Sequence, residues 1–428
     1  MVKKSKTDSS KEKKNKTSGE NEVLEIKNSN LMIYTFFIFG FAIIFLSLIS
    51  VIFPGLIISF LGDEEFLEPF EMGQMAWPLI ITNIVFFTLL FLYKKQRLPN
   101  SFGDFLEKIS LFDLSQKNSL ILLLIIFGIY ISFTANELSY YEGEQFGDFI
   151  ILEQAMDIWP DGKSDVSYVS EQLSRYVRMA LLVASEEIFQ NVKVIPYIAS
   201  IALLAVTYFL TVKFSKKNFT GLLSVILVIQ SDTFLKYDTI AVYENFWVLF
   251  YIFSIYLIFK NPKISSPFFL LSIFSKAITV LMLPISIIVT LLSEISKNKK
   301  IFVLTTYAIV IGISLIIFQF SDSIYTDVVE INTSEFWIGF TTLPFNLRFD
   351  WFLLLFLLPV STVLFMKARG GDRNSISLMV LIGGTILVTP VLEMITNFYF
   401  VYPYRYIPLI VFFSIAVSTL FTKNNQCS

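Results

Sequence analysis

The sequence contains no histidine and a single cysteine, Cys427, beside its C-terminus. The absence of histidine excludes imidazole as a general acid or base, as a metal ligand and as a haem ligand. The lone cysteine excludes an intrachain disulfide and a cysteine-ligated cluster, and its terminal place argues against a nucleophilic role. Any chemistry must therefore rest on carboxylates, lysine, arginine, tyrosine, hydroxyl groups or a metal ion held by carboxylates.

Charge is scarce as well. Only 16% of the 428 residues are charged, 55% are hydrophobic, and the mean hydropathy is +0.67. A soluble domain cannot bury that much apolar surface, whereas a bilayer accepts it. The apolar runs 31–61, 75–93, 119–135 and 194–212 approach or exceed the roughly 20 residues that a membrane-spanning helix needs. Because backbone polar groups in lipid must be satisfied within the segment, the sequence predicts an all-α, polytopic integral membrane protein.

Composition divides the chain into three regions. Residues 1–30 are rich in Lys, Ser, Asn and Glu, which predicts a disordered cytoplasmic tail. Residues 31–118 would form two membrane helices and an amphipathic segment at the inner interface. Residues 119–428 hold the remaining membrane helices. The first apolar run is longer than the roughly 7–15 residues of a signal-peptide core, so we expect a retained helix.

The positive-inside rule orients these helices. The basic loops 94–97, 213–217 and 367–373 would lie in the cytoplasm, and the acidic stretches 62–74 and 136–171 outside. This pattern places the N-terminus in the cytoplasm and leaves the side of the C-terminus open. It predicts about eleven crossings of the cell membrane.

One helical stretch does not fit a simple crossing. Residues 172–192 carry Arg175, Arg178, Glu186 and Glu187, which a span through lipid would have to bury at high cost. We therefore expect an interfacial or shallow re-entrant helix on the outer side, within a long outer loop.

Carboxylates gather directly after the apolar run 119–135, at Glu137, Glu142, Glu144 and Asp148. A carboxylate in this place is a candidate general base that deprotonates an acceptor hydroxyl. For each of the four, a solvated loop residue is the alternative. No residue is assigned as a metal ligand, and the cofactor stays open, with a divalent cation held by carboxylates as one candidate.

Three cations on the predicted outer side are candidates for binding a donor phosphate: Lys276, Arg405 and Arg178. A phosphate leaving group gains charge as its bond breaks, and nearby cations stabilise that charge. Arginine binds phosphate through two parallel hydrogen bonds, and lysine acts as a point charge. The alternatives are snorkelling of Lys276 to the interface and an aromatic-belt anchor at Arg405.

Four further residues are candidates for lining the substrate pocket. Asp238 and Glu244 flank the start of an apolar helix, and Tyr140 and Tyr404 offer faces on which a sugar ring can stack. Helix capping is the alternative for Asp238, and a favourable helix-dipole charge is the alternative for Glu244.

The order of four short motifs carries a family resemblance. The sequence reads Ala-Asn-Glu-Leu-Ser-Tyr-Tyr at 135–141, and a polar turn ending in an acid at 231–238 and 241–244. A lysine turn follows at 272–276, and Arg-Tyr-Ile-Pro stands at 405–408 before the last helix. This order, over residues 119–420, resembles the GT-C superfamily of membrane glycosyltransferases, which includes protein O-mannosyltransferases and aminoarabinose transferases.

The resemblance implies a GT-C-like core, an outer loop with interfacial helices and a polyprenyl-phosphate sugar donor. It also implies an acid of the first outer loop as base, which maps best to Glu137, with Glu142, Glu144 and Asp148 as alternates. The family's Asp-Glu or Asp-x-Asp signature is replaced here by Asn136-Glu137 and by Glu142-x-Glu144.

The expected function is transfer of a sugar from a polyprenyl-phosphate donor to an acceptor on the extracytoplasmic face. The expected partners are the lipid bilayer, that donor and an acceptor that the sequence does not name, with no nucleic acid. Two alternatives stay open. A secondary transporter would usually show two related halves, and no internal repeat is visible. A non-catalytic scaffold of the cell envelope is the other.

Overall fold

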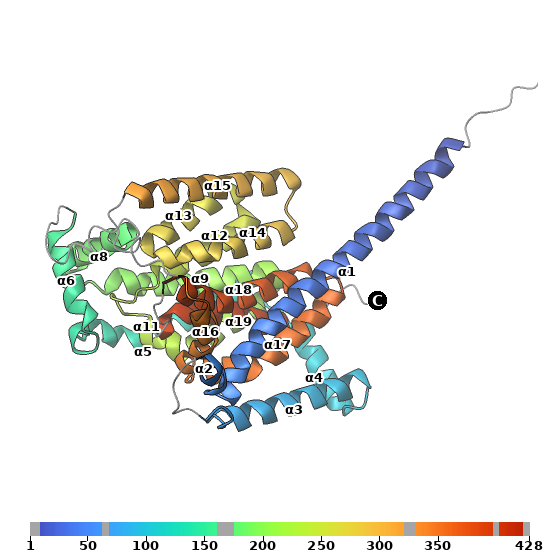
Figure 1. Cartoon of the computed structure of the whole chain (residues 1–428), viewed down its shortest axis with the longest axis horizontal. Coiled ribbons are helices and arrows are strands. Elements are labelled where there is room, and N and C mark those ends of the chain that lie inside the picture. The colour runs from blue at the N-terminus through green and yellow to red at the C-terminus, as the bar shows by residue number, and fades with distance from the viewer. Residues whose placement is uncertain (1–8, 62–67, 161–174, 321–330, 397–401, 423–428) are drawn as a thin grey trace, which may run out of the picture.

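The computed structural model describes residues 9–61, 68–160, 175–320, 331–396 and 402–422, and every regular element in them is a helix (Figure 1). Seven helices are long and apolar enough to cross a membrane, judged by length and composition: Asn30–Ile52, Ala76–Lys94, Gln116–Ser139, Val194–Ser215, Lys297–Ile316, Trp351–Arg369 and Arg373–Ile395. Four further apolar helices are shorter: Asn218–Ile229, Phe246–Lys260, Ala277–Leu292 and Pro403–Thr419. The all-helical prediction is confirmed for these residues, and the candidate spans are compatible with a multi-pass membrane protein. The count of about eleven crossings stays a prediction.

The α-helices of the described residues, in chain order, are α1 (Ser9–Ile52), α2 (Leu56–Leu61), α3 (Ala76–Lys94), α4 (Asn100–Leu111), α5 (Gln116–Thr134), α6 (Asp148–Ile158), α8 (Tyr176–Phe189), α9 (Val194–Ser215), α10 (Asn218–Ile229), α11 (Asp232–Tyr237), α12 (Phe246–Lys260), α13 (Ser265–Ser275), α14 (Leu283–Leu292), α15 (Lys297–Phe320), α16 (Thr333–Asn346), α17 (Trp351–Arg369), α18 (Arg373–Thr396) and α19 (Ile407–Thr419). Short 3-10 helices connect several of them: η1 (Ala135–Ser139), η2 (Glu142–Glu144), η4 (Pro262–Ile264), η5 (Ala277–Met282) and η7 (Pro403–Tyr406).

The first helix differs from the sequence prediction at both ends. α1 begins at Ser9, so residues 9–30 are helical where the sequence predicts a disordered tail. Lysine and glutamate are frequent in this stretch and have high helix propensity, and the helix extends clear of the rest of the molecule (Figure 1). At the other end, Pro54 lacks a backbone N–H and α1 stops at Ile52. The apolar run 31–61 therefore forms two elements, α1 and α2.

The last helix, α19, forms the centre of the bundle, with nearly all of its residues buried. It packs against α9, α10, α17 and α18. Neighbouring helices approach closely at small residues, as is common between membrane helices. At Gly221 of α10, an added Cβ atom would lie 2.7 Å from the Tyr208 ring of α9. Hydroxyl groups join the same pair, since Thr211 donates a hydrogen bond of 2.8 Å to Ser224.

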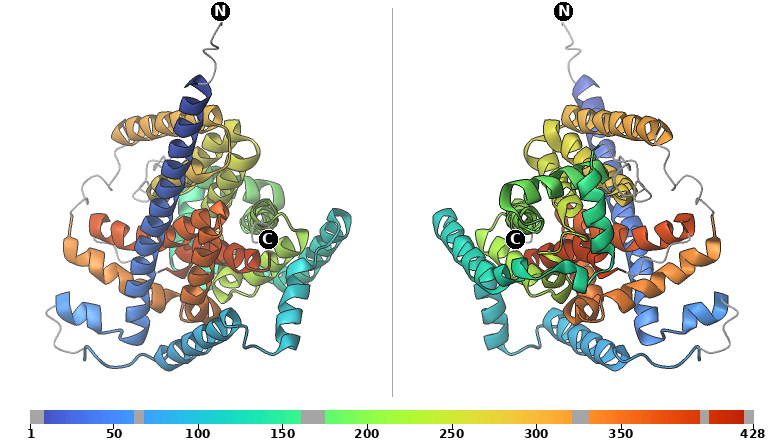
Figure 2. Two further views of the ribbon diagram at one scale, coloured as in Figure 1. Left: turned by 90° about the vertical axis from the view of Figure 1, so that its right-hand side faces the viewer. Right: turned by 90° about the vertical axis from the view of Figure 1, so that its left-hand side faces the viewer.

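Two helices present apolar side chains outward along their length. Trp77 and Ile84 of α3, and Leu124 and Phe133 of α5, are exposed, and both views in Figure 2 show α3 and α4 at the periphery of the bundle. Exposed apolar surface of this extent is unfavourable in water and favourable against lipid tails. These faces are therefore the parts of the molecule that best fit a bilayer.

Polar contacts at each end of the bundle join segments that the charge pattern places on the same side. At the predicted outer end, Thr239 donates to a carboxylate oxygen of Glu137 over 3.1 Å. At the predicted inner end, the backbone N–H of Asn218 donates to Asp113 over 2.9 Å. These two contacts are compatible with the alternation of the loops, which stays a prediction.

The lone cysteine makes the orientation directly testable. In a Cys427→Ser background, Glu144→Cys should react with a membrane-impermeant maleimide on intact cells, because position 144 is exposed on the predicted outer side. Lys263→Cys, exposed on the predicted inner side, should react only after permeabilisation. Labelling in the reverse order would place the loop after α5 in the cytoplasm.

Candidate functional site

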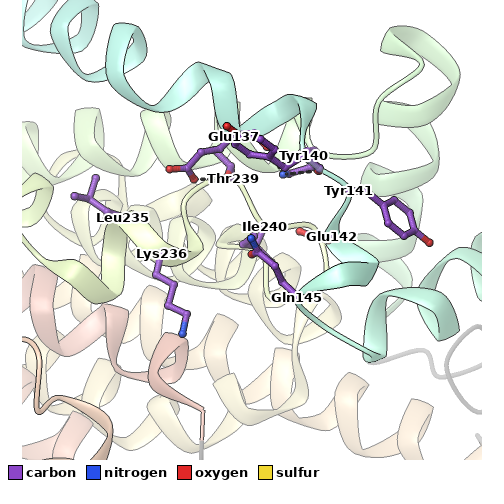
Figure 3. A pocket seen from close by; sticks show the side chains of 10 residues that line it. Glu137, Tyr140, Tyr141, Glu142, Gln145, Leu235, Lys236, Thr239 and Ile240 are labelled. Atoms are coloured by element: carbon purple, nitrogen blue, oxygen red, sulfur yellow. Dashed lines mark hydrogen bonds between the residues drawn. The ribbon is translucent and has the colours of Figure 1, made fainter.

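A cavity of about 350 Å³ lies where η1 and η2 meet the start of α9 and the end of α11 (Figure 3). Its walls are formed by Glu137, Tyr140, Tyr141, Glu142, Gln145, Lys193, Leu235, Lys236, Thr239 and Ile240. Glu137, Tyr140 and Glu142 are therefore the predicted site residues that share this cavity. The other predicted residues lie behind its walls or on the surface nearby.

Short and interrupted helices bring these side chains together. α5 gives way after Thr134 to the 3-10 turn η1, which carries Glu137. On the other wall, α11 is only six residues long and begins at a cap, where the Ser231 hydroxyl accepts the N–H of Phe234 over 3.1 Å. Because α11 ends at Tyr237, the backbone that follows it runs beside the cavity without regular helical structure until α12 begins.

Among the four acids that follow α5, Glu137 is best placed to meet a bound molecule. Its carboxylate is half-buried, and one oxygen accepts the Thr239 hydroxyl over 3.1 Å. The other oxygen takes no hydrogen bond from any residue that the structure describes. A half-buried carboxylate with a free oxygen at a cavity wall is able to accept a proton from a ligand hydroxyl.

Glu142 is buried, and it binds backbone rather than the cavity interior. One carboxylate oxygen accepts the N–H of Ala241 over 2.5 Å, and the other accepts the N–H of Val242 over 3.2 Å. Burial raises the pKa of Glu142 to about 7, although the two amide hydrogen bonds and the charges of Lys193 and Arg178 act in the opposite direction. Its geometry is that of a backbone clamp, not of a base.

The remaining two acids of the loop stay outside the cavity. Glu144 and Asp148 are exposed and form no part of its walls. Asp148 accepts the hydroxyl of Tyr243 over 2.8 Å. Of the four acids, Glu137 is thus the one that lines the cavity with a carboxylate oxygen free of hydrogen bonds from the described residues.

Lys193 is a cavity residue that sequence reasoning missed. It immediately precedes α9 and is 5% exposed. Its ammonium donates to the backbone carbonyls of Glu137 and Tyr140, the second over 3.3 Å. The available signal was its position, because a lysine at the predicted outer end of a span departs from the positive-inside pattern.

A second group of predicted residues meets behind the cavity, and we call Arg178, Glu244, Lys276, Tyr404 and Arg405 the cationic cluster. Arg178 and Glu244 form an ion pair of 3.6 Å, and Glu244 is fully buried. The hydroxyl of Tyr404 accepts hydrogen bonds from Lys276 over 2.7 Å and from Arg405 over 3.3 Å. Lys276 is close enough to Glu244 and Arg178 for their charges to interact. The cluster thus brings together three cations and one carboxylate.

The helix break at Lys276 explains why its side chain reaches this cluster. α13 ends at Ser275, and Lys276 itself is extended, with φ −159° and ψ 119°, before η5 begins. An extended residue between two helices directs its side chain away from both axes. The lysine turn that the sequence predicts between two short helices is therefore present, and it faces η7 at Tyr404.

Residues 239–245, which we call the dividing segment, separate the cavity from the cationic cluster. Thr239 and Ile240 line the cavity, and Glu142 of the cavity wall accepts the backbone N–H groups of Ala241 and Val242. From the other side, Arg178 donates to the carbonyl of Val242 over 2.8 Å. Glu244 then joins the cluster. Neighbouring residues of one short segment therefore contact both the cavity wall and the cationic cluster.

Tyrosine rings pack beside the dividing segment. Tyr243 stacks on Tyr404 with ring centroids 4.7 Å apart and an interplanar angle of 18°. Tyr237 meets Tyr404 edge-on at 5.6 Å. Tyr404 is buried and stacks on protein rather than offering a free face. Tyr140, by contrast, is 63% exposed at the cavity wall, so it is the predicted tyrosine that remains accessible to a ligand.

Asp238 lies behind the cavity wall rather than in it. The residue is fully buried and accepts the hydroxyl of Tyr130 from α5 over 2.5 Å. Its carbonyl accepts the hydroxyl of Ser200 from α9 over 2.7 Å. Burial raises the pKa of Asp238 to about 7. Asp238 thus joins three helices and anchors the start of the dividing segment, while the sequence predicts it in the substrate pocket.

The carboxylates form no cluster typical of a metal site in the part of the chain that the structure describes. No group of three or more Asp, Glu or Cys side chains there is arranged to hold a metal ion. Glu142 uses both of its oxygens on backbone amides. The identity of any cofactor therefore stays open.

Comparison of the chain with known protein families, with curated proteins and with solved structures found no match. The resemblance to GT-C glycosyltransferases therefore rests on the order of its motifs.

For the ion pair between Arg178 and Glu244, removing one partner should cost more stability than removing both. Arg178→Met leaves Glu244 buried without this partner, and we expect the free energy of unfolding to fall by about 3 kcal/mol. Arg178→Met combined with Glu244→Leu should recover much of that loss, because no carboxylate is then stranded. Unfolding in detergent micelles measures both. Arg348→Met, which removes an exposed guanidinium resting on Phe345, is the matched control. An Arg178→Met protein as stable as the wild type would contradict this account.

Glu142 should make stability depend on pH. Between about pH 4.5 and 7, the folded protein holds a proton on Glu142 that the unfolded chain releases, so this stabilisation decreases as pH rises through the window. Glu142→Gln does not titrate. We expect the melting temperature of the wild type, relative to Glu142→Gln, to fall between about pH 5 and pH 8. Asp238 titrates in both proteins and cancels in the difference. A difference that is constant across this range would show that Glu142 does not titrate there.

Proposed function

We propose that the chain is a glycosyltransferase that moves a sugar from a polyprenyl-phosphate donor to an acceptor on the extracytoplasmic face, with a GT-C-like membrane core. One observation carries the proposal. A cavity with a half-buried carboxylate, Glu137, lies across a single backbone segment from a partly buried cluster of three cations and one carboxylate. Transfer from a phosphate donor needs a base for the acceptor and cations for the leaving group, within reach of one substrate pair.

In this reaction Glu137 would take the proton from the acceptor hydroxyl. The acceptor oxygen then forms the new glycosidic bond at the anomeric carbon of the donor sugar, and the bond from that carbon to the phosphate oxygen breaks. The electron pair of the broken bond remains on the phosphate. General-base assistance of this kind contributes roughly a hundredfold to ten-thousandfold in rate.

The cationic cluster would stabilise the phosphate that departs. Arg178 and Lys276 are fixed by the groups around them, Arg178 by Glu244 and the Val242 carbonyl, and Lys276 by Tyr404. Charges that are oriented before the reaction, in a site of low dielectric constant, stabilise developing charge without reorganising. A polyprenyl chain would remain in the bilayer while its phosphate reaches this end of the bundle.

The placement of charge supports an enzyme over the alternatives. A transporter usually binds its solute near the bilayer midplane, between repeats. Here the candidate residues gather at one end of the helices, with Glu137 after α5 and Lys276 between two short helices. A scaffold would need no half-buried carboxylate beside a cavity, since such a group costs desolvation.

Replacing the proposed base provides the main test. Purified protein in nanodiscs should consume a polyprenyl-phosphate sugar from a panel of such donors, and Glu137→Gln should lower that rate at least about a hundredfold, because the amide cannot accept the proton. Glu144→Gln is the matched control, since Glu144 lies on the same loop and is exposed outside the cavity. Its rate should stay at the wild-type level.

Melting temperatures of both variants exclude a folding defect. Equal loss of activity in the two variants, or full activity of Glu137→Gln, would remove Glu137 from the mechanism. Uptake of a soluble solute that tracks expression, with no donor consumption by any panel member, would favour the transporter.

A further inference from the structure

The polar groups of the cavity differ in how much hydrogen-bonding capacity they have left for a ligand. Both oxygens of Glu142 are taken by backbone amides. Lys193 is 5% exposed and directs two of its three N–H donors to backbone carbonyls. The Thr239 hydroxyl donates to Glu137. These groups build the walls, so a ligand is recognised by the capacity that remains elsewhere.

Lys236 is the charged cavity residue whose capacity is unused. Its side chain is exposed, and within the described chain its ammonium forms no hydrogen bond or ion pair. The ammonium lies over the Tyr237 ring, 5.6 Å from the ring centroid. The side chain extends away from Glu137 (Figure 3), so the two opposite charges do not neutralise each other.

Two further groups at the cavity wall are available to bind a ligand, one on Glu137 and one on Gln145. One oxygen of Glu137 is free among the described residues to accept a hydroxyl, and the Gln145 side chain at the wall offers both a donor and an acceptor. The ring of Tyr140 is exposed beside them and suits stacking on a sugar face. A ligand that satisfies the whole set has hydroxyl groups at one end and a negative charge at the other.

We infer that this cavity binds an acidic sugar, a hydroxylated ring that carries a carboxylate or a phosphate, with Lys236 as the residue that selects the negative charge. The inference rests on the proposed function in one respect, because it makes this sugar the acceptor whose hydroxyl faces Glu137. The shared chemistry is the anionic substituent, and carboxylate and phosphate are distinguished by experiment.

Binding of matched sugars tests this selection. Glucose, glucuronate and glucose 6-phosphate share one ring and differ at one carbon. Isothermal titration of the full chain, in nanodiscs of zwitterionic lipid, should give at least one of the two anionic sugars an affinity about fivefold higher than that of glucose, as expected for a solvent-exposed charge pair. The preference should weaken as salt is raised, because the pair is screened. The anionic sugar with the higher affinity shows whether the site prefers a carboxylate or a phosphate.

Variants assign the preference to Lys236. Lys236→Met keeps the apolar stem against Tyr237 and should bind all three sugars with equal affinity, whereas Lys236→Arg should retain the preference. Lys260→Met is the matched control, because Lys260 is also exposed and its ammonium also lies 5.6 Å from a tyrosine ring, that of Tyr256 at the other end of the bundle. This control should behave as the wild type.

The inference would be overturned if the wild type bound none of the three sugars, or if it bound all three equally. It would also be overturned if the preference for an anionic sugar survived Lys236→Met. Because binding is read without turnover, the outcome is separate from that of the Glu137→Gln experiment. An anion preference that depends on Lys236, in a protein that consumes no donor, would leave the binding site intact and remove the transferase.

Discussion

The arrangement of the outer end depends on how the dividing segment is held. Residues 239–245 form no regular helix, and their backbone groups would be unsatisfied in a bilayer-embedded protein without partners. The Glu142 carboxylate receives two consecutive amides from one side, and the Arg178 guanidinium binds a carbonyl from the other. Irregular backbone at this depth is tolerated where it is enclosed by protein and lines a cavity. The two hydrogen bonds to Glu142 thus hold the dividing segment where it can contact both the cavity and the cationic cluster.

The charges around this segment divide into groups that stabilise the architecture and groups that remain free to interact. Glu142, Asp238 and Lys193 are buried and direct their hydrogen bonds to the protein itself. Each would be costly to bury alone, and each has at least one hydrogen bond to backbone or to tyrosine, although Asp238 Oδ1 has no hydrogen-bond partner among the described residues. Glu137 and Lys236 keep unused capacity at the cavity wall. A polar site inside an apolar bundle needs both kinds, since the first fixes the geometry in which the second operates.

The sequence predicts more of the helices than of the site. Long apolar runs identify the helical class and most candidate spans, because hydropathy over about 20 residues is decisive in lipid. The lysine turn at Lys276 and the helix around Arg178 were also predictable, while the interfacial place of that helix stays a prediction. The roles of the four loop acids were not, since Glu137 and Glu142 look alike in sequence and differ only in what the distant residues 239–242 present to them. Lys193 was missed because a lysine beside a span is common. Helix α1 begins before its apolar run because lysine and glutamate propagate a helix once it has started.

The stack between Tyr243 and Tyr404 has a consequence for biogenesis. The two rings come from segments that are synthesised at very different times, one in the middle of the chain and one just before α19. Until the last helix has entered the bundle, Lys276 lacks the phenol hydroxyl to which it donates, and the centre that α19 fills is open. This group of side chains is therefore complete only once the last helix has packed, so a partly synthesised chain would hold Lys276 without its tyrosine partner.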